Sequence, residues 1–178
     1  MADDTAQTPF ERIAELFASH DVEFIVIGGQ AEAILGSARV TYDIDLCYRR
    51  TADNFERLAA ALKTLQPRLR GAPPDLRFRL DAESLALGNN FTFSTNAGDL
   101  DLLGYLEPLG GYEDIVQGAE TVRIGDVAVK VISLDDLIRI KQHLGRPKDR
   151  DALQHLLAIK RVREGDAPDQ RSDRMESK

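Results

Sequence analysis

The chain has 178 residues, of which 43% are hydrophobic and 30% charged, and its formal net charge is −7. This length and composition suit one globular domain and exclude a disordered chain, and no apolar run is long enough to span a membrane. The acidic balance also argues against a protein whose main task is to hold a long polyanion, because such binding depends on clustered Lys and Arg.

The N-terminal residues predict a location and a first helix. Residues 1–5 are acidic and lack the apolar segment of a secretory signal, so we expect a cytoplasmic protein. Thr8 is suited to cap a helix, with Pro9 at its first position and Glu11 three residues after the cap in a capping box. Apolar residues at helical spacing then predict a helix that ends at about Ser19.

A glycine pair follows the next apolar run. Residues 24–27 predict a strand, and Gly28 and Gly29 end it and permit close approach to the backbone. We expect a short helix over 30–35 that ends at Gly36. The unpaired N–H groups at the start of this helix would lie beside the glycines, where they favour an anion.

Two aspartates occupy the following apolar run. Residues 43–48 predict a strand, in which Asp43 and Asp45 lie on one face while Ile44 points into the core. Adjacent anions in an apolar segment are unfavourable without a cation or strong donors, and carboxylates are preferred ligands of Mg²⁺. The pair therefore predicts a metal and nucleotide-phosphate site, although two exposed aspartates on a strand edge are also a common structural pattern. Cys47, the only cysteine, is expected to be a buried small hydrophobe.

The rest of the chain predicts further elements and a third carboxylate. Asp99 and Asp101 share one face of a strand, and we favour Asp101 as a metal ligand because leucines flank it, whereas Asp99 lies next to a turn and suits solvent. In chain order we expect a helix over 52–64 capped by Thr51, a loop with one short helix over 66–87, a hairpin of strands 91–95 and 99–103, a helical turn or two over 112–119, a hairpin of strands 121–124 and 127–131, a helix from the cap Ser133 to 144, and a last helix from Pro147 to 162.

The glycine pair, Asp43-Ile44-Asp45 about a dozen residues later and the later Asp101-Leu102-Leu103 together resemble the DNA polymerase β-like nucleotidyltransferase superfamily. The likeness extends over residues 24–160 and is strongest to small bacterial minimal or toxin-type (AbiEii-like) members and to aminoglycoside nucleotidyltransferases. Their C-terminal signature is similar to 133–138 followed by Lys141 and 146–149. The chain departs from the pattern at Gln30, where many members have a serine whose hydroxyl contacts phosphate.

The resemblance implies an α+β fold, with a mixed twisted sheet, helices packed on it and a small C-terminal helical segment. The nucleotidyltransferase core would cover 1–132, the helical segment of the same domain 133–163, and a polar, disordered tail 164–178. The implied reaction moves an NMP from an NTP to an acceptor hydroxyl and releases pyrophosphate. Asp43, Asp45 and Asp101 would be catalytic and bind two Mg²⁺ ions, for which Mn²⁺ could substitute. The residues implied to bind the nucleotide are Gly28, Gly29, Gln30, Arg39, Thr41, Lys141 and Lys148.

The sequence leaves the acceptor open. The resemblance allows a tRNA or protein hydroxyl, as in toxin-type members with an antitoxin partner, or an aminoglycoside hydroxyl. A basic cluster favours RNA, whereas the acidic balance favours a cationic drug. The alternative is a non-catalytic nucleotide-binding protein or toxin–antitoxin partner on the same fold, and the complete set of three aspartates argues against it. The basic cluster consists of Arg68, Arg70, Arg77 and Arg79.

Overall fold

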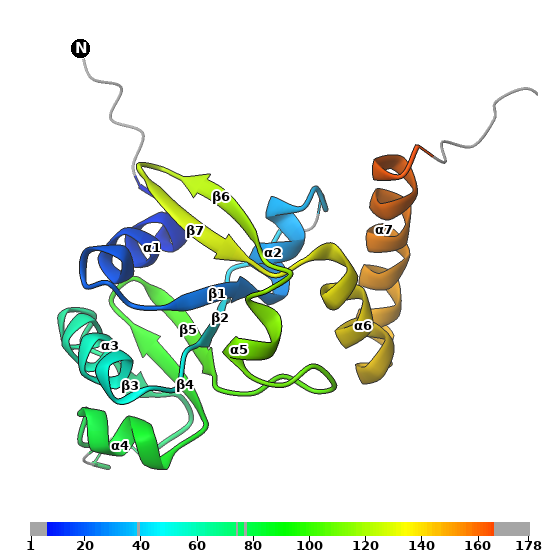
Figure 1. The fold of residues 1–178 in the computed structure, drawn as a ribbon. Coiled ribbons are helices and arrows are strands. Elements are labelled where there is room, and N and C mark those ends of the chain that lie inside the picture. Colours follow the sequence, from blue (N-terminus) through cyan, green and yellow to red (C-terminus); the bar gives the residue numbers. More distant parts are fainter. Residues whose placement is uncertain (1–6, 39, 74, 77, 166–178) are drawn as a thin grey trace, which may run out of the picture.

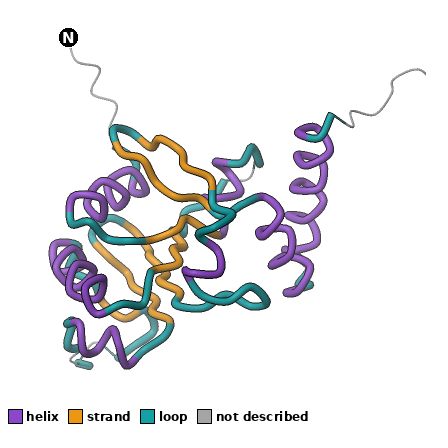
Figure 2. Tube along the Cα trace, viewed as in Figure 1, coloured by secondary structure: helices purple, strands orange, loops and turns teal. Residues whose placement is uncertain are grey.

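The computed structural model describes residues 7–38, 40–73, 75–76 and 78–165. Within them, seven strands form one mixed sheet in the order β3-β4-β5-β2-β1-β7-β6 (Figures 1 and 2). The pairs β1–β7 and β2–β5 are parallel, and the other neighbouring pairs are antiparallel. The strands are β1 Phe24–Ile27, β2 Ile44–Tyr48, β3 Arg68–Leu69, β4 Asn90–Thr95, β5 Gly98–Leu103, β6 Glu120–Ile124 and β7 Val127–Val131.

Helices lie on both sides of the sheet (Figure 2), and three of those described start after capping residues predicted from the sequence. The side chain of Thr8 accepts a hydrogen bond from the Glu11 N–H in a complete capping box, and Thr51 and Ser133 cap their helices in the predicted way. Among the described helices, none has both the length and the apolar character needed to cross a membrane. The helices are α1 Pro9–Ser19, α2 Gly28–Ile34, α3 Ala52–Thr64, α4 Ala82–Leu87, α5 Tyr112–Ile115, α6 Leu134–Leu144 and α7 Pro147–Arg163.

The two longest N-terminal helices cover the same face of the sheet. Phe24 of β1 and Tyr48 of β2 are directly paired, so their side chains share a face. Phe17 of α1 packs edge-on against Phe24, and Phe55 of α3 packs against Tyr48, with ring centroids 5.6 and 6.3 Å apart. Each buried aromatic side chain stabilises the fold by about 1.5–3 kcal/mol. The side chain of Asp45, three positions before Tyr48, therefore points to the opposite face of the sheet.

The C-terminal helices contact α2 and the residue that follows it. Helices α6 and α7 pack against each other, and their buried residues include Leu137 and Leu156. Lys141 of α6 forms an ion pair with Glu32 of α2, and Arg163 at the end of α7 donates a hydrogen bond to the Leu35 carbonyl. The helices thus form one wall beside the open face of the sheet (Figure 1). Of the predicted tail, only residues 164 and 165 lie within the described residues.

Two expectations about boundaries were wrong. Helix α2 begins at Gly28 itself instead of after the glycine pair, directly after the extended residue Ile27. Gly28 tolerates the φ of +60° with which the chain turns from the strand into the helix. The second error concerns 66–87, which contains the expected short helix α4 but also the two-residue edge strand β3. The first residue of this strand, Arg68, pairs with Ser94 of β4. A two-residue strand has too few positions to show an alternating pattern.

Candidate active site

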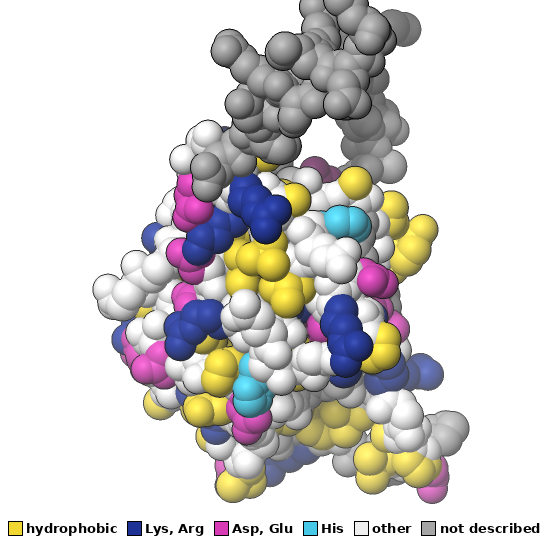
Figure 3. All heavy atoms as spheres, turned by 90° about the vertical axis from the view of Figure 1, so that its right-hand side faces the viewer, with side chains coloured by type: hydrophobic (Ala, Val, Ile, Leu, Met, Phe, Trp, Pro, Cys, Tyr) yellow, Lys and Arg dark blue, Asp and Glu magenta, His cyan; other side chains and the backbone are white. Residues whose placement is uncertain are grey.

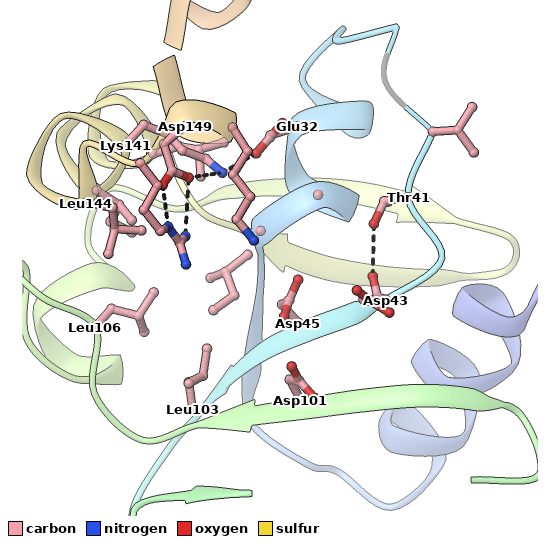
Figure 4. A pocket seen from close by; sticks show the side chains of 18 residues that line it. Glu32, Thr41, Asp43, Asp45, Asp101, Leu103, Leu106, Lys141, Leu144 and Asp149 are labelled. Carbon is pink, nitrogen blue, oxygen red and sulfur yellow. Dashed lines mark hydrogen bonds and ion pairs between the residues drawn. The ribbon is translucent and has the colours of Figure 1, made fainter. Parts of the chain in front are cut away.

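A cleft of about 580 Å³ lies between the open face of the sheet and α6–α7 (Figure 4). Three kinds of side chain line it: carboxylates from the sheet, cations from α6 and α7, and leucines at one end. The glycine pair closes the side between them. The lining residues are Ile27, Gly28, Gly29, Glu32, Val40, Thr41, Asp43, Asp45, Asp101, Leu103, Leu106, Leu137, Ile140, Lys141, Leu144, Arg146, Lys148 and Asp149.

The glycine pair fits closely against neighbouring polar side chains. Gly28 has a φ of +60°, which non-glycine residues rarely adopt, and a Cβ at this position would overlap the Asp45 carboxylate. A Cβ on Gly29 would come within 2.6 Å of the Thr41 hydroxyl oxygen. The absence of a side chain at both positions therefore lets Asp45 and Thr41 pack directly against the backbone of this turn, which lines the cleft.

The aspartates of β2 and β5 lie next to each other. Asp45 is paired directly with Asp101 across the parallel strands, so the two residues share a face about 4.8 Å apart, the usual spacing of strands. Asp43 precedes β2 by one residue and is exposed, and Thr41 donates a hydrogen bond to its carbonyl. Figure 4 shows the side chains of Asp43, Asp45 and Asp101 on the same side of the cleft.

The environment of Asp45 disfavours its charge. Burial, followed by the nearby negative charge of Asp43, raises the pKa of Asp45 above its usual value. A hydrogen bond from the Gly29 backbone N–H and the more distant charges of Lys141 and Arg70 act in the opposite direction. A cation placed between the carboxylates would remove the repulsion and stabilise the charged form.

The third carboxylate is paired with an arginine. Arg70, which follows β3, forms a short ion pair with Asp101, and its other terminal nitrogen lies 3.6 Å from Asp99. Ser94 donates a hydrogen bond of 2.8 Å to the same Asp99 carboxylate. Within the described ranges no group of three His, Cys, Asp or Glu side chains is arranged to hold a metal ion. The donor set has the carboxylate chemistry that Mg²⁺ prefers, but Arg70 neutralises one member of it.

The opposite wall is a buried network of ion pairs. The Lys141 ammonium lies 2.6 Å from Glu32 and 3.5 Å from Asp149, and the Asp149 side chain is only 1% exposed (Figure 4). Arg146 Nε donates to Asp149 Oδ2 at 2.5 Å, and this contact is the main reason why the pKa of Asp149 is lowered. Two acids and two bases thus compensate one another, as buried charges require. Asp149 orients Arg146, whose side chain is half exposed, at the edge of the cleft.

Most of the predicted site residues meet in this cleft. It brings together Gly28, Gly29, Thr41, Asp43, Asp45, Asp101, Lys141 and Lys148. Gln30 does not line the cleft, and Arg39 lies outside the described residues. Sequence reasoning missed Glu32, and the only signal for it was a single acid in an otherwise apolar short helix. It also missed the leucines, which follow strand and helix patterns indistinguishable from those of core residues.

No family model matches the chain, and neither does any curated protein. Solved structures do match it. The lincosamide antibiotic adenylyltransferase LnuA, in a lincomycin-bound structure, superposes with a TM-score of 0.56 at 17% identity, covering 85% of this chain and 96% of that chain. The antibiotic-resistance factor ANT(2'')-Ia gives 0.57 at 13% identity, covering 88% of each chain. A nucleotidyltransferase-like protein from Paracoccidioides brasiliensis gives 0.53 at 18% identity, covering 86% of this chain and 74% of that chain. The expected α+β fold of the polymerase β-like nucleotidyltransferases is confirmed.

Proposed function

We propose that this chain, which has the nucleotidyltransferase fold, transfers an NMP from an NTP to an acceptor hydroxyl and releases pyrophosphate. The observation that carries the proposal is the cleft itself, in which Asp45 and Asp101 are paired on adjacent strands beside Gly28. In the reaction, the acceptor oxygen forms a bond to the α-phosphorus while the bond from this phosphorus to the β-bridging oxygen breaks. The acceptor proton passes to a carboxylate of the site or to water, and pyrophosphate leaves. This chemistry depends mainly on positioning and charge stabilisation.

Asp43, Asp45 and Asp101 are the residues that would hold divalent ions. Their carboxylates match the preference of Mg²⁺, or of Mn²⁺ in its place. Two such ions, when bound, would stabilise the attacking and leaving oxygens. Asp43 and Asp45 would contact both ions, and Asp101 the one nearer the acceptor. The raised pKa of Asp45 supports this role, because a cation relieves the unfavourable charge. Arg70 would compete with such an ion for Asp101, because its guanidinium contacts one oxygen of that carboxylate.

The phosphates would lie between the glycine turn and the basic wall. Gly28 and Gly29 line the cleft beside the aspartates, and the Gly29 backbone N–H, which hydrogen-bonds to Asp45 in the metal-free site, would turn to a phosphate when a cation holds that carboxylate. Arg146 and Lys148, from the start of α7, line the facing wall and supply positive charge. We assign Lys141 a mainly structural role in this wall, because its ammonium already forms ion pairs with Glu32 of α2 and Asp149 of α7. The leucines at the end of the cleft exclude water from the reacting groups.

A second candidate function is nucleotide binding without turnover, including a role as a partner in a toxin–antitoxin pair. The ion pair between Arg70 and Asp101 favours it, because a guanidinium stands where the reaction needs a cation. The complete set of aspartates favours catalysis.

Melting temperature measured with each of the four Mg-NTPs at millimolar concentration tests the proposal. A ligand that binds only the folded state stabilises it, by about 2.7 kcal/mol at 100 times its dissociation constant. We expect at least one Mg-NTP to raise the melting temperature and Asp45→Asn to remove most of this shift. Asp126→Asn, the same change in the exposed turn between β6 and β7, is the control and should retain the shift.

Pyrophosphate release with RNA, protein and aminoglycoside acceptors then separates the two candidates. A melting shift without pyrophosphate release from any acceptor would favour binding without turnover. The absence of any shift would contradict both.

A further inference from the structure

The row of site carboxylates continues across the sheet as a polar surface. Asp101 is paired with Thr92 of β4, and the Arg70 N–H donates to the Thr92 carbonyl, so Asp45, Asp101, Thr92 and Arg70 form one cross-strand row. Directly paired residues in a sheet place their side chains on the same face. The Arg70 ion pair with Asp101 shows that the arginine reaches back along this row.

A second row runs parallel to the first, two residues later in β4 and two residues earlier in the antiparallel strand β5. Asp99 is paired with Ser94, and Ser94 is paired with Arg68 of β3. The hydrogen bond between Ser94 and Asp99 confirms that both side chains lie on this face. Arg68, Thr92 and Ser94 are exposed, whereas Phe91 and Phe93 of β4 point into the core. We call the four exposed residues Arg68, Arg70, Thr92 and Ser94 the β3–β4 shelf.

The geometry of phosphoryl transfer assigns a side of the site to the acceptor. In an in-line displacement the attacking oxygen and the leaving pyrophosphate lie on opposite sides of the phosphorus. The glycine turn follows β1, on one side of Asp45, and β5, β4 and β3 follow in order on the other side. If pyrophosphate leaves toward Gly28 and Gly29, the acceptor must approach over Asp101 and the β3–β4 shelf.

The net charge of the side chains on the acceptor side of the site depends on whether a divalent ion is bound. Without a divalent ion, Arg70 is compensated by Asp101 and Asp99. A divalent ion held by Asp101 would compete with the guanidinium for that carboxylate and would weaken the ion pair, while the contact of Arg70 with Asp99 would remain. Arg68 adds a second positive charge in the neighbouring row. With an ion bound, the two guanidiniums would outweigh the one remaining carboxylate of Asp99, and this side of the site would favour an anion over a cation.

We propose that the β3–β4 shelf binds the acceptor, and that the acceptor carries a phosphate group close to its reacting hydroxyl. The inference rests on the proposed function and names the class of its second substrate. Two guanidiniums from adjacent rows can share the oxygens of one phosphate, the geometry for which arginine is best suited. The Thr92 hydroxyl supplies a further donor, whereas the Ser94 hydroxyl already donates to Asp99. A phosphodiester chain and a small phosphorylated molecule share this chemistry.

Binding of a fluorescent single-stranded hexaribonucleotide to the full chain, with Mg²⁺ and α,β-methylene-ATP present, tests the shelf. We expect Arg68→Gln and Arg70→Gln each to weaken binding roughly fivefold and to reduce the salt dependence of log K by about 0.7, the value for one phosphate contact on a single strand. Arg123→Gln makes the same charge change on β6, at the opposite edge of the sheet, and should leave binding unchanged.

Competition separates the sources of the phosphate. Displacement of the oligonucleotide by ribose 5-phosphate would support the shelf with a small phosphorylated acceptor, and resistance to it would support a phosphodiester chain. If neither probe binds, if the two shelf variants bind like wild type, or if kanamycin binds more tightly than both probes, the shelf does not select a phosphate and the inference is overturned.

Mn²⁺ binding to the same samples, followed by electron paramagnetic resonance, distinguishes failure of the shelf from failure of the proposed function. Because Arg70 competes with the ion for Asp101, Arg70→Gln should tighten Mn²⁺ binding severalfold, whereas Arg68→Gln, the same charge loss without the contact, should change it less than twofold. Equal effects of the two variants would contradict the competition. Loss of Mn²⁺ binding in Asp45→Asn, together with unchanged oligonucleotide binding in both arginine variants, would refute the shelf and leave the proposed function standing. Mn²⁺ that fails to bind even the wild-type protein would count against the proposed function itself.

Discussion

Burial and the charge of Asp43 raise the pKa of Asp45, and this shift has a consequence for stability as well as for metal binding. A carboxyl group whose pKa is higher in the folded state stabilises the fold below its unfolded-state pKa, and this contribution is lost as the pH rises through the folded-state pKa. At neutral pH and without a divalent ion, the charged Asp45 therefore weakens the fold.

Asp45→Asn should consequently make the metal-free protein more stable at pH 7. The amide keeps the shape of the side chain and removes the repulsion, so we expect the free energy of unfolding in urea with EDTA to rise by roughly 0.5–2 kcal/mol, the range of single stabilising changes at functional sites. The gain should disappear below about pH 4, where the carboxyl is protonated in both states. A variant less stable than wild type at pH 7 would show that Asp45 is already compensated.

Lys141 is the residue for which the structure changes the expected effect most. From the sequence it is a phosphate contact, but its ammonium lies between Glu32 and Asp149, with the Lys141 side chain only 14% exposed. Lys141→Met should lower the free energy of unfolding by about 3–5 kcal/mol, because it leaves Glu32 buried without a partner.

The double variant Lys141→Met with Glu32→Leu provides the control, since replacing both members of a buried pair by apolar residues is often neutral. We expect the double variant to recover most of the lost free energy of unfolding in urea. The double-mutant cycle then gives the interaction energy between Lys141 and Glu32. If Lys141→Met instead folds normally and only weakens Mg-NTP binding, the phosphate role predicted from the sequence is the correct one.

At the scale of elements, the turn between β1 and α2 depends on the absence of a side chain at Gly28. An alanine there would meet two separate penalties: the φ of +60° and the overlap with the Asp45 carboxylate. Gly71→Ala is a matched control, because Gly71 has a φ of +77° and a methyl group added there would meet no atom within 4 Å. The left-handed conformation alone costs about 1–2 kcal/mol.

Gly28→Ala should therefore destabilise the protein more than Gly71→Ala and should also reduce Mn²⁺ binding, because Asp45 must move. Urea unfolding gives the first difference, and electron paramagnetic resonance gives the second. Equal destabilisation by the two changes, with Mn²⁺ binding retained, would mean that Asp45 tolerates the new methyl group.

Elements with local signals could be predicted from the sequence, whereas contacts between distant segments could be predicted only where the family resemblance implied them. Three helix starts predicted from the caps Thr8, Thr51 and Ser133 were confirmed, because the capping residue and the N–H group that it accepts from lie within four residues of sequence. The predictions that Cys47 is buried and that Asp101 lies beside Asp45 were also confirmed. Burial alone raises the pKa of the Cys47 thiol to about 12. The ion pair of Arg70 with Asp101 was not foreseen, because it joins residues 31 positions apart through a two-residue strand.

For the whole molecule, the distribution of charge supports a local basic surface instead of a broad one. The face that carries α7 shows Lys and Arg side chains separated by apolar and uncharged ones (Figure 3). On α7 itself, Arg146 pairs with Asp149, Lys160 with Asp135 and Arg163 with Glu120. With a net charge of −7, long-range attraction of a polyanion is weak, so a phosphate-bearing acceptor would have to be recognised by close contacts such as those of the shelf.

The dependence of the whole fold on its C-terminal helices can be tested by truncation. Helices α6 and α7 contribute buried apolar side chains and, with the cap residue Arg146, three of the four members of the ion-pair network. Each buried leucine or isoleucine contributes about 1.5–3 kcal/mol, so the loss of several exceeds much of the 5–15 kcal/mol by which a typical domain is stable. The buried residues concerned are Leu134, Leu137, Ile138, Ile140 and Leu156.

A chain that ends at Ile132 should therefore show no cooperative unfolding transition, whereas a chain that ends at Gly165 retains every described helix and strand and should unfold at the wild-type urea concentration. Leu156→Ala in the full chain is the graded version of the same test. It should cost about 2–5 kcal/mol, the usual effect of deleting a fully buried leucine side chain, because Leu156 is 0% exposed between α7 and its neighbours. If residues 1–132 instead unfold cooperatively by themselves, the predicted core is an independent domain and α6–α7 serve only to complete the cleft. In that case the shortened chain should still bind Mn²⁺ through Asp43 and Asp45 but should lose affinity for the triphosphate, because Arg146 and Lys148 are missing.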